Sequence, residues 1–138
     1  MGSLDPKNTT TADKGPLIVT VDDDSISLRI IRSTLEKKGY VVKTATSGEE
    51  ALMMLREMVP DILILDVMME GMSGYDVCHI AKTDKRLQDV PVIFLTGKDS
   101  PTDFKTGQEL GAIFYLTKPV RPDRLLQVVR MLRPSSIG

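Results

Sequence analysis

The chain has 138 residues, of which 41% are hydrophobic and 27% are charged, and its formal net charge is −1. These values are ordinary for one globular domain with a single core, and they leave too little chain for two domains. The near-zero charge gives no reason to expect binding to nucleic acid or to an anionic membrane, and no apolar run is long enough to span a bilayer.

The first 15 residues are polar and contain no apolar segment of the kind that a secretory signal requires. We interpret residues 1–15 as a disordered lead-in, with a candidate tag at its start, residues 16–133 as one domain, and residues 134–138 as a flexible tail. The single cysteine, Cys78, cannot form an internal disulfide, which suits a reducing compartment. The expected location is the cytoplasm.

Five short apolar runs are predicted to be strands. Several are apolar at nearly every position, whereas a strand with one wet face would alternate. Continuous runs are typical of strands that are covered on both faces of a parallel sheet. The predicted strands are Leu17–Val21, Val41–Ala45, Ile62–Leu65, Val92–Leu95 and Ile113–Leu116.

A segment of helical character follows each predicted strand. The first runs from Ser25, its predicted N-cap, to Lys38, with an apolar stripe that includes Ile26, Ile30 and Leu35, and Gly39 suits a left-handed stop. In the second, Ser47 and Glu50 have the spacing of a capping box. This second helix is predicted to run from Ser47 to about Met58, the third from about Gly74 to Thr83, and the fourth from near Ser100 and Pro101 to before Gly111. The fifth begins near Pro122 and carries Leu125, Leu126, Val129 and Leu132 on one side.

This fivefold strand–helix alternation predicts an α/β fold, a doubly wound parallel sheet with helices on both faces. In such folds ligands bind at the carboxyl ends of the strands, near the point where the strand order reverses. The residues expected at that edge are Asp22, Asp23 and Asp24 after the first strand, Asp66 after the third, Thr96 and Lys98 after the fourth, and Lys118 and Pro119 after the fifth.

The acidic residues at this edge predict a bound cation. A single aspartate after a strand often only caps the next helix, but three adjacent carboxylates near Asp66 repel one another unless a positive charge lies between them. Mg²⁺ suits an all-oxygen site, and it retains several waters. Zinc or iron is disfavoured, because the only imidazole, His79, and the only thiol, Cys78, lie together on the third helix.

Lys118 and Thr96 supply a positive charge and a hydroxyl group at the same edge. Each has an ordinary interpretation as a solvated loop lysine and a strand-end threonine. Pro119 indicates a specified backbone after Lys118 and admits a cis peptide bond, an isomer that the sequence leaves open. No P-loop and no G-x-G-x-x-G motif is present, so a nucleotide-binding fold is disfavoured.

Together these residues resemble the receiver domain of two-component response regulators, of the CheY-like superfamily. The resemblance covers roughly residues 16–133, and its motifs are weak singly but highly specific in this order. They are Val21-Asp22-Asp23, Leu65-Asp66-Val67-Met68-Met69, Gly74, Thr96 and Lys118-Pro119. The resemblance implies a flavodoxin-like fold with five parallel strands in the order 2-1-3-4-5.

By this resemblance, Asp66 accepts a phosphoryl group from a phosphohistidine on a sensor histidine kinase or a phosphotransfer protein. Asp23 and Asp66 bind Mg²⁺ directly, Asp22 binds it through water, and the backbone carbonyl of Met68 completes the protein ligands. The protein is then a phosphorelay switch that assists its own phosphorylation and dephosphorylation, not a turnover enzyme.

The resemblance also implies how the switch works. Thr96 and Lys118 hold phosphoryl oxygens, and Tyr115 rotates inward as Thr96 moves. The face made by the fourth helix, the fifth strand and the fifth helix changes and is read by an output domain, a partner protein or a second copy of the chain. Direct binding to nucleic acid or to a membrane is not expected of this domain.

Three positions qualify the resemblance. Glu70 follows Met69 where the family usually has proline. Met68 and Lys98 occupy the two positions that tend to set the lifetime of the phosphoryl group. An apolar side chain at position 68 cannot orient an attacking water, so we expect slow self-dephosphorylation.

Two other classes of protein remain open from the sequence. One is a Mg²⁺-dependent phosphatase of the haloacid-dehalogenase type, which would use Asp22 and Asp24 as a D-x-D pair. The other is a pseudo-receiver that acts without phosphorylation, although such proteins usually lack one of the site residues. Turnover of small phosphate esters would favour the phosphatase, and failure to gain a phosphoryl group would favour the pseudo-receiver.

Overall fold

The computed structural model describes residues 15–97 and 104–132. The expected lead-in up to residue 14, the tail, Lys98 and the predicted start of the fourth helix at Ser100 and Pro101 lie outside the described residues. In chain order the elements are β1 (Leu17–Val21), α1 (Ser25–Glu36), β2 (Val41–Ala45), α2 (Gly48–Glu57), β3 (Ile62–Asp66), α3 (Gly74–Ala81), η2 (Lys85–Leu87), β4 (Val92–Thr96), α4 (Phe104–Glu109), β5 (Ala112–Thr117) and α5 (Pro122–Leu132).

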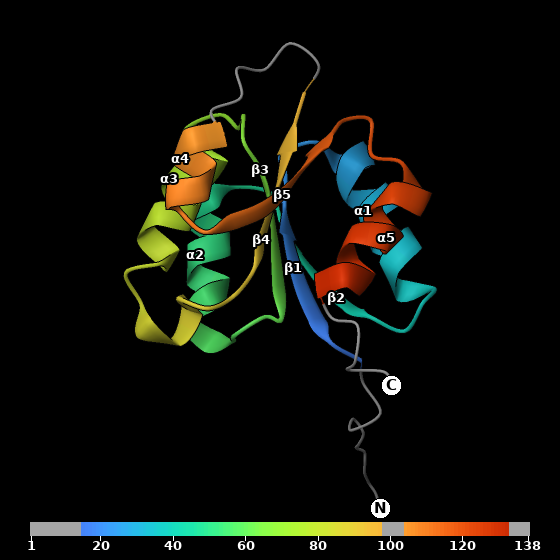
Figure 1. The fold of residues 1–138 in the computed structure, drawn as a ribbon, viewed down its shortest axis with the longest axis horizontal. Coiled ribbons are helices and arrows are strands. Elements are labelled where there is room, and N and C mark those ends of the chain that lie inside the picture. Colours follow the sequence, from blue (N-terminus) through green and yellow to red (C-terminus); the bar gives the residue numbers. More distant parts are fainter. Residues whose placement is uncertain (1–14, 98–103, 133–138) are drawn as a thin grey trace, which may run out of the picture.

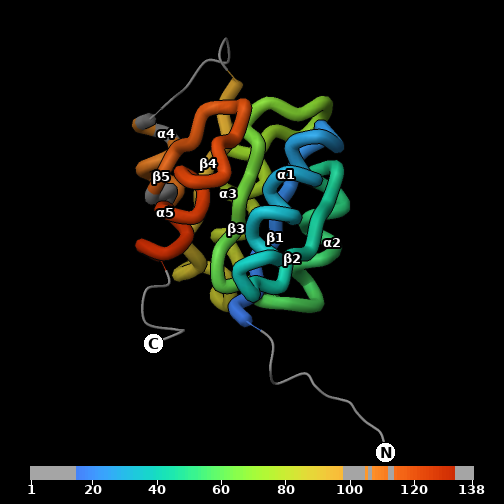
Figure 2. Tube along the Cα trace, turned by 90° about the vertical axis from the view of Figure 1, so that its right-hand side faces the viewer, coloured from blue at the N-terminus to red at the C-terminus, as the bar shows by residue number. Residues whose placement is uncertain are grey.

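The five strands form one parallel sheet in the order β2-β1-β3-β4-β5, which confirms the predicted fold. Helices α2, α3 and α4 cover one face and helices α1 and α5 cover the other (Figure 1). Helices α1 and α5 lie side by side on their face (Figure 2). The strand order reverses between β1 and β3, so the carboxyl ends of these two strands are the expected place for a site.

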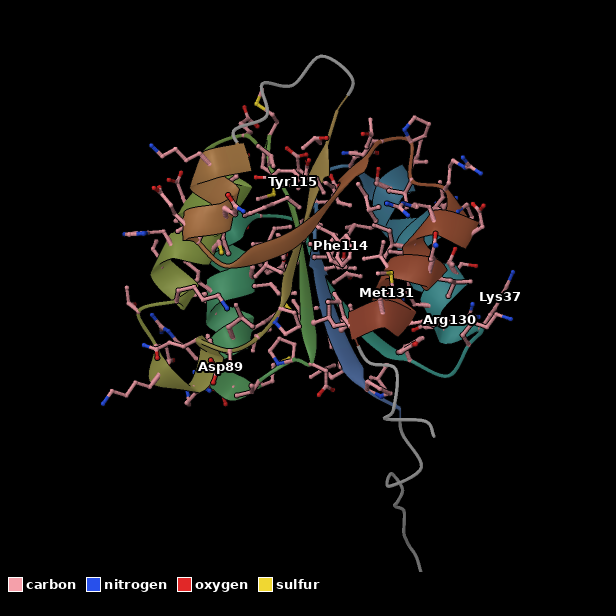
Figure 3. The ribbon with its side chains drawn as sticks, in the orientation of Figure 1. Lys37, Asp89, Phe114, Tyr115, Arg130 and Met131 are labelled. Carbon is pink, nitrogen blue, oxygen red and sulfur yellow. The ribbon has the colours of Figure 1, made fainter. Side chains whose placement is uncertain are left out.

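Each face of the sheet carries its own hydrophobic core. Adjacent strand residues point to opposite faces, so Ile18 packs toward α1 and α5 and Val19 packs toward α2 and α3. On β5, Phe114 likewise packs on the face of α1 and α5, and Tyr115 packs on the opposite face (Figure 3). This two-sided burial explains why the predicted strands β3 and β4 are nearly continuously apolar, whereas β2 carries the exposed Lys43.

The start of α1 differs from the prediction. Asp24, not Ser25, is the N-cap, because its side chain accepts a hydrogen bond from the Ile26 N–H. Ile26 is 64% exposed, so it does not belong to the buried stripe. The buried face of α1 is formed by Ser27, Leu28, Ile31 and Leu35. The predicted stop after α1 has the expected left-handed backbone, since Gly39 has φ of 92°.

The predicted cap of α2 is present in a modified form. Ser47 Oγ accepts the Glu50 N–H at 3.1 Å, as expected of an N-cap. The Glu50 carboxylate, however, accepts the N–H of Thr46 at 2.7 Å instead of the N–H of Ser47.

The remaining boundaries differ from prediction by one or two residues. Strands β3 and β4 include Asp66 and Thr96 as their last residues, because each continues the ladder with its neighbour. Helix α3 ends at Ala81 rather than near Thr83, and the short helix η2, which was not predicted, follows it. The extension of these two strands places Asp66 and Thr96 on the sheet rather than in loops.

Candidate functional site

The carboxyl ends of β1 and β3 bring three aspartates together. Asp22 and Asp23 follow β1, Asp66 ends β3, and the two strands are paired up to Val21 and Leu65. One carboxylate oxygen of each aspartate lies within 4.8 Å of the others. The sheet topology thus produces the acidic cluster that the sequence predicted at this edge.

Asp22 is the fully buried member of the cluster. Its Oδ1 accepts hydrogen bonds from the Asp24 N–H at 2.9 Å and from Lys118 Nζ at 3.2 Å. Its Oδ2 lies 3.0 Å from Lys118 Nζ, yet within the described part of the chain it has no partner with hydrogen-bond geometry. A buried carboxylate oxygen in this condition retains the capacity to accept a further electropositive ligand.

Asp66 is only 2% exposed, and its Oδ2 lies 3.5 Å from Lys118 Nζ. Burial and the nearby charge of Asp22 raise the pKa of Asp66 to about 7, and Lys118 offsets this increase only in part. Lys118 therefore does not fully neutralise the two adjacent buried carboxylates, and a further positive charge would stabilise their ionised forms.

Lys118 is positioned by the end of β4. Its N–H donates to the Thr96 carbonyl at 2.7 Å, and its peptide bond to Pro119 is cis. Burial lowers the pKa of Lys118, but its hydrogen bond to Asp22 and the charges of Asp22 and Asp66 leave that pKa above its ordinary value. Thr96 is itself buried at the end of β4. Lys118 is thus held as a cation beside both carboxylates.

Asp23 is the exposed member of the cluster. Its Oδ2 accepts the N–H of Glu70 at 3.1 Å, which ties the loop after β1 to the loop after β3. Met68, in the latter loop, exposes 56% of its surface. One carboxylate oxygen of Asp23 is anchored in this way, and the other is available to a ligand.

Gly74 holds the start of α3 against the backbone of Asp66. A Cβ atom at position 74 would lie 2.2 Å from the Asp66 carbonyl oxygen, and the Gly74 N–H donates to the Val67 carbonyl at 3.1 Å. Only glycine fits at this distance. The backbone after the predicted phosphoacceptor is thereby fixed to a helix.

The donor set fits Mg²⁺. Carboxylate oxygens of Asp22, Asp23 and Asp66 converge, Asp22 Oδ2 lacks a hydrogen bond, and no imidazole or thiol of the described residues joins the cluster. Mg²⁺ prefers oxygen ligands and few protein contacts. Cys78 is buried and its Sγ donates to the Leu110 carbonyl, and His79 is exposed, so both lie outside the site.

Asp24 does not take part in the cluster. Its carboxylate caps α1 and also accepts the Ser27 hydroxyl at 3.1 Å. The hydrogen bond from the Ile26 N–H is the largest of the interactions that lower the pKa of Asp24. A general acid needs a pKa near the working pH. The capping role and the lowered pKa of Asp24 therefore disfavour the D-x-D phosphatase alternative, in which Asp24 would be the second aspartate.

Tyr115 lies on β5 with its side chain toward α3 and α4 (Figure 3). Its hydroxyl is 3.1 Å from the hydroxyl of Tyr75 on α3. The sequence did not reveal the roles of Tyr75 and of the Glu70 backbone, because contacts between residues far apart in the chain leave no periodic signal. Of the predicted site residues, Lys98 alone lies outside the described part of the chain.

The sequence and structure match one family. The model of the response regulator receiver domain matches residues 18–130. This chain belongs to the response regulator receiver domains. The receiver domain is 39% identical over 122 residues to the alkaline phosphatase synthesis transcriptional regulatory protein PhoP of Bacillus subtilis, covering 88% of this chain and 50% of that protein.

Two further relatives support the assignment. The response regulator PleD of Caulobacter vibrioides is 40% identical over 115 residues, which cover 83% of this chain and 25% of PleD. The structure of the chemotaxis protein CheY4 of Vibrio cholerae superposes on the receiver domain with a TM-score of 0.80 and 30% identity, covering 86% of this chain and 98% of that one. The receiver domain thus spans at most half the length of the two curated relatives.

No helix in residues 15–97 or 104–132 of the receiver domain combines the length and the apolar composition that crossing a membrane requires.

Proposed function

We propose that the receiver domain accepts a phosphoryl group onto Asp66 from a phosphohistidine of a sensor histidine kinase or a phosphotransfer protein, with Mg²⁺ bound by Asp23, Asp66 and the Met68 carbonyl and, through water, by Asp22. The observation that carries this proposal is the juxtaposition of a buried aspartate, two further carboxylates and Lys118 at the reversal point of the sheet. Phosphoryl transfer depends mainly on such positioning and charge neutralisation.

In the proposed reaction, an Asp66 oxygen forms a bond to phosphorus while the bond from phosphorus to the donor imidazole nitrogen breaks. The imidazole leaves with the electron pair of that bond and takes up a proton. Asp66 must be ionised to attack, and with a pKa of about 7 it needs nearby positive charge to stay ionised. Bound Mg²⁺ would supply that charge, and Lys118 and Thr96 would hold phosphoryl oxygens.

The output of the proposed switch is the face formed by α4, β5 and α5, in which Tyr115 is the residue that rotates. An output domain, a partner protein or a second copy of the chain would read this face. One relative is described as a transcriptional regulatory protein, which fits an output outside the receiver domain itself. The proposed location is the cytoplasm, where a free and buried Cys78 stays reduced.

Mass spectrometry after incubation with acetyl phosphate and Mg²⁺ tests the proposal. We expect wild type to gain the mass of one phosphoryl group and Asp66→Asn to gain none. An equal gain in both proteins would exclude Asp66 as the acceptor, and no gain in wild type would favour a pseudo-receiver. Repeated turnover of small phosphate esters would instead favour a phosphatase.

A further inference from the structure

The hydroxyl groups of Tyr75 and Tyr115 meet at the boundary between α3 and α4. They lie 3.1 Å apart, so one donates a hydrogen bond to the other. Tyr75 belongs to α3 and Tyr115 to β5, and the two residues are 40 positions apart in the sequence. This contact links a helix near the proposed phosphorylation site to the proposed output face.

Phe94 of β4 supports both tyrosine rings. It is fully buried, with its ring centroid 4.7 Å from that of Tyr75 in an edge-on arrangement and 5.5 Å from that of Tyr115. Aromatic pairs at these distances attract beyond their buried area. The two tyrosines therefore flank one rigid ring.

Gly107 of α4 provides the space for the Tyr115 hydroxyl. A Cβ atom at position 107 would clash with that hydroxyl and would lie 2.8 Å from Tyr115 Cζ. Glycine inside a helix is destabilising relative to alanine. The contact gives a physical reason for glycine here, because any side chain would displace Tyr115.

Tyr75 is also connected to the proposed phosphoacceptor. It follows Gly74 directly, and Gly74 is packed on the Asp66 carbonyl and bonded to the Val67 carbonyl. A shift of the backbone after Asp66 therefore moves the first turn of α3, which carries Tyr75. Thr96 is not part of this chain of contacts.

We propose that Tyr75 and Gly107 are positioning residues for Tyr115: the Tyr75 hydroxyl holds the Tyr115 hydroxyl in the space that Gly107 leaves open in α4. The contact forms a second connection between Asp66 and the face of α4, β5 and α5, separate from Thr96. This inference rests on the proposed function, since it concerns how the same switch is coupled.

A double-mutant cycle tests the coupling. The apparent dissociation constant for beryllofluoride, a phosphoryl mimic, is measured with Mg²⁺ for wild type, Tyr75→Phe, Tyr115→Phe and the double variant. One neutral hydrogen bond corresponds to about fivefold in an equilibrium constant. We expect Tyr75→Phe to change the constant by threefold to fivefold in wild type and to leave it unchanged when Tyr115 is already phenylalanine.

Tyr40 provides the matched control, because it is a buried tyrosine in the core between the sheet and α1. Tyr40→Phe should leave the beryllofluoride constant unchanged. Equal effects of Tyr75→Phe in the presence and absence of the Tyr115 hydroxyl would overturn the inference. The mass gain at Asp66 is measured in parallel, so that failure of the proposed function is distinguished from failure of the coupling.

Gly107→Ala tests the contact with α4 independently. We expect this variant to shift the ring resonances of Tyr115 in NMR spectra of the metal-free protein, whereas Gln108→Ala, at an exposed position of the same helix, should not. Unchanged Tyr115 resonances in Gly107→Ala would overturn the role of Gly107.

Discussion

At the scale of single residues, the electrostatics of the site depend on the different solvent exposure of its three carboxylates. Asp22 and Asp66 are buried, whereas Asp23 is exposed and anchored by one backbone amide. Lys118 is the cation beside both buried groups. The free energy of folding and the affinity for a cation are therefore linked through the same few side chains.

The pH dependence of stability follows from Asp66. Its pKa is raised from 3.8 to about 7 in the folded protein, so the folded state binds more protons between these values. The stabilising contribution of the Asp66 proton is therefore fully present below about pH 4, falls as pH rises through this window and is lost above pH 7. In metal-free protein at pH 8, Asp66→Asn should be more stable than wild type by about 2–4 kcal/mol.

Urea unfolding at pH 4.0, 6.0 and 8.0, chosen as steps across this window, measures the difference. Asp89→Asn is the control, because Asp89 is exposed and lies at the opposite end of the sheet (Figure 3). Mg²⁺ should reduce the advantage of Asp66→Asn, since the ion stabilises the ionised wild type. Parallel pH profiles for wild type and Asp66→Asn would contradict the prediction.

The Glu70 amide is expected to orient Asp23 toward the metal. Glu70→Pro removes the N–H that Asp23 Oδ2 accepts, and Glu70→Ala retains it. Proline is the usual residue of the family here, so the loop should tolerate its ring. Loss of such an outer contact weakens metal binding by about tenfold. Calorimetric titration with Mg²⁺ should show this loss for Glu70→Pro relative to Glu70→Ala, and equal affinities would show that the bond does not orient Asp23.

The lifetime of the phosphoryl group is expected to depend on Met68. Its side chain is exposed next to the site but cannot accept a hydrogen bond from water as an amide can. Met68→Asn should accelerate decay of the acyl phosphate by about tenfold or more, the range of one positioned polar group. Decay is followed by mass spectrometry after removal of the donor, with Met131→Asn as an exposed methionine control on α5. No acceleration would count against this role of position 68.

At the scale of elements, the segment between α3 and β4 is organised by one lysine. Lys82 Nζ donates to the carbonyls of Leu87, Gln88 and Val90 at 3.1, 2.9 and 2.6 Å. These three residues precede β4, and the ammonium group donates to all three of their carbonyls, although the Leu87 carbonyl also accepts the Val90 N–H. The lysine acts as a cap for this segment, although burial lowers its pKa.

Lys82→Met should therefore destabilise the protein. It removes the ammonium donor from three carbonyls, of which that of Leu87 keeps the Val90 N–H, and we expect the free energy of unfolding to fall by about 2 kcal/mol. Lys85→Met is the control, since Lys85 is exposed on the neighbouring η2. Urea unfolding measures both variants, and equal stabilities would contradict the proposed cap.

Elements were predictable from sequence to the extent that their signals are local. The central strands were found because burial on both faces makes them nearly continuously apolar, and the cap at Ser47 because its partner is three residues away. Ile26 was wrongly included in the α1 stripe: it lies in the first turn of the helix and is 64% exposed, whereas Leu35 of the same stripe is buried. The clustering of Asp22, Asp66 and Lys118 followed from topology, but the contact of Tyr75 with Tyr115 depends on side-chain packing that has no sequence period.

At the scale of the whole molecule, one sheet separates two cores that have no residues in common. Every strand contributes side chains to both, so neither core can melt while the sheet persists. We expect unfolding to be a single cooperative transition.

Leu125→Ala tests this cooperativity. Leu125 is fully buried in the core between the sheet, α1 and α5, and its truncation should lower stability by about 3 kcal/mol. Native-state hydrogen exchange should then show equal loss of protection for amides of α1 and of α2, on opposite faces. Leu126→Ala, at a half-buried position of the same helix, should cost less. Loss confined to the α1 face would contradict a single transition.

The parallel sheet also determines how the protein can be handled in the laboratory. Strand β1 begins, and α5 ends, at the end of the sheet opposite the carboxyl ends of the strands (Figure 1). A fluorescent protein or a biosensor anchor joined to the chain before β1 or after α5 would therefore connect to the domain at the end away from the acidic cluster. An immobilised sample would present the aspartates to the bulk solution, so access of a proposed phosphodonor could be measured without steric interference from the anchor.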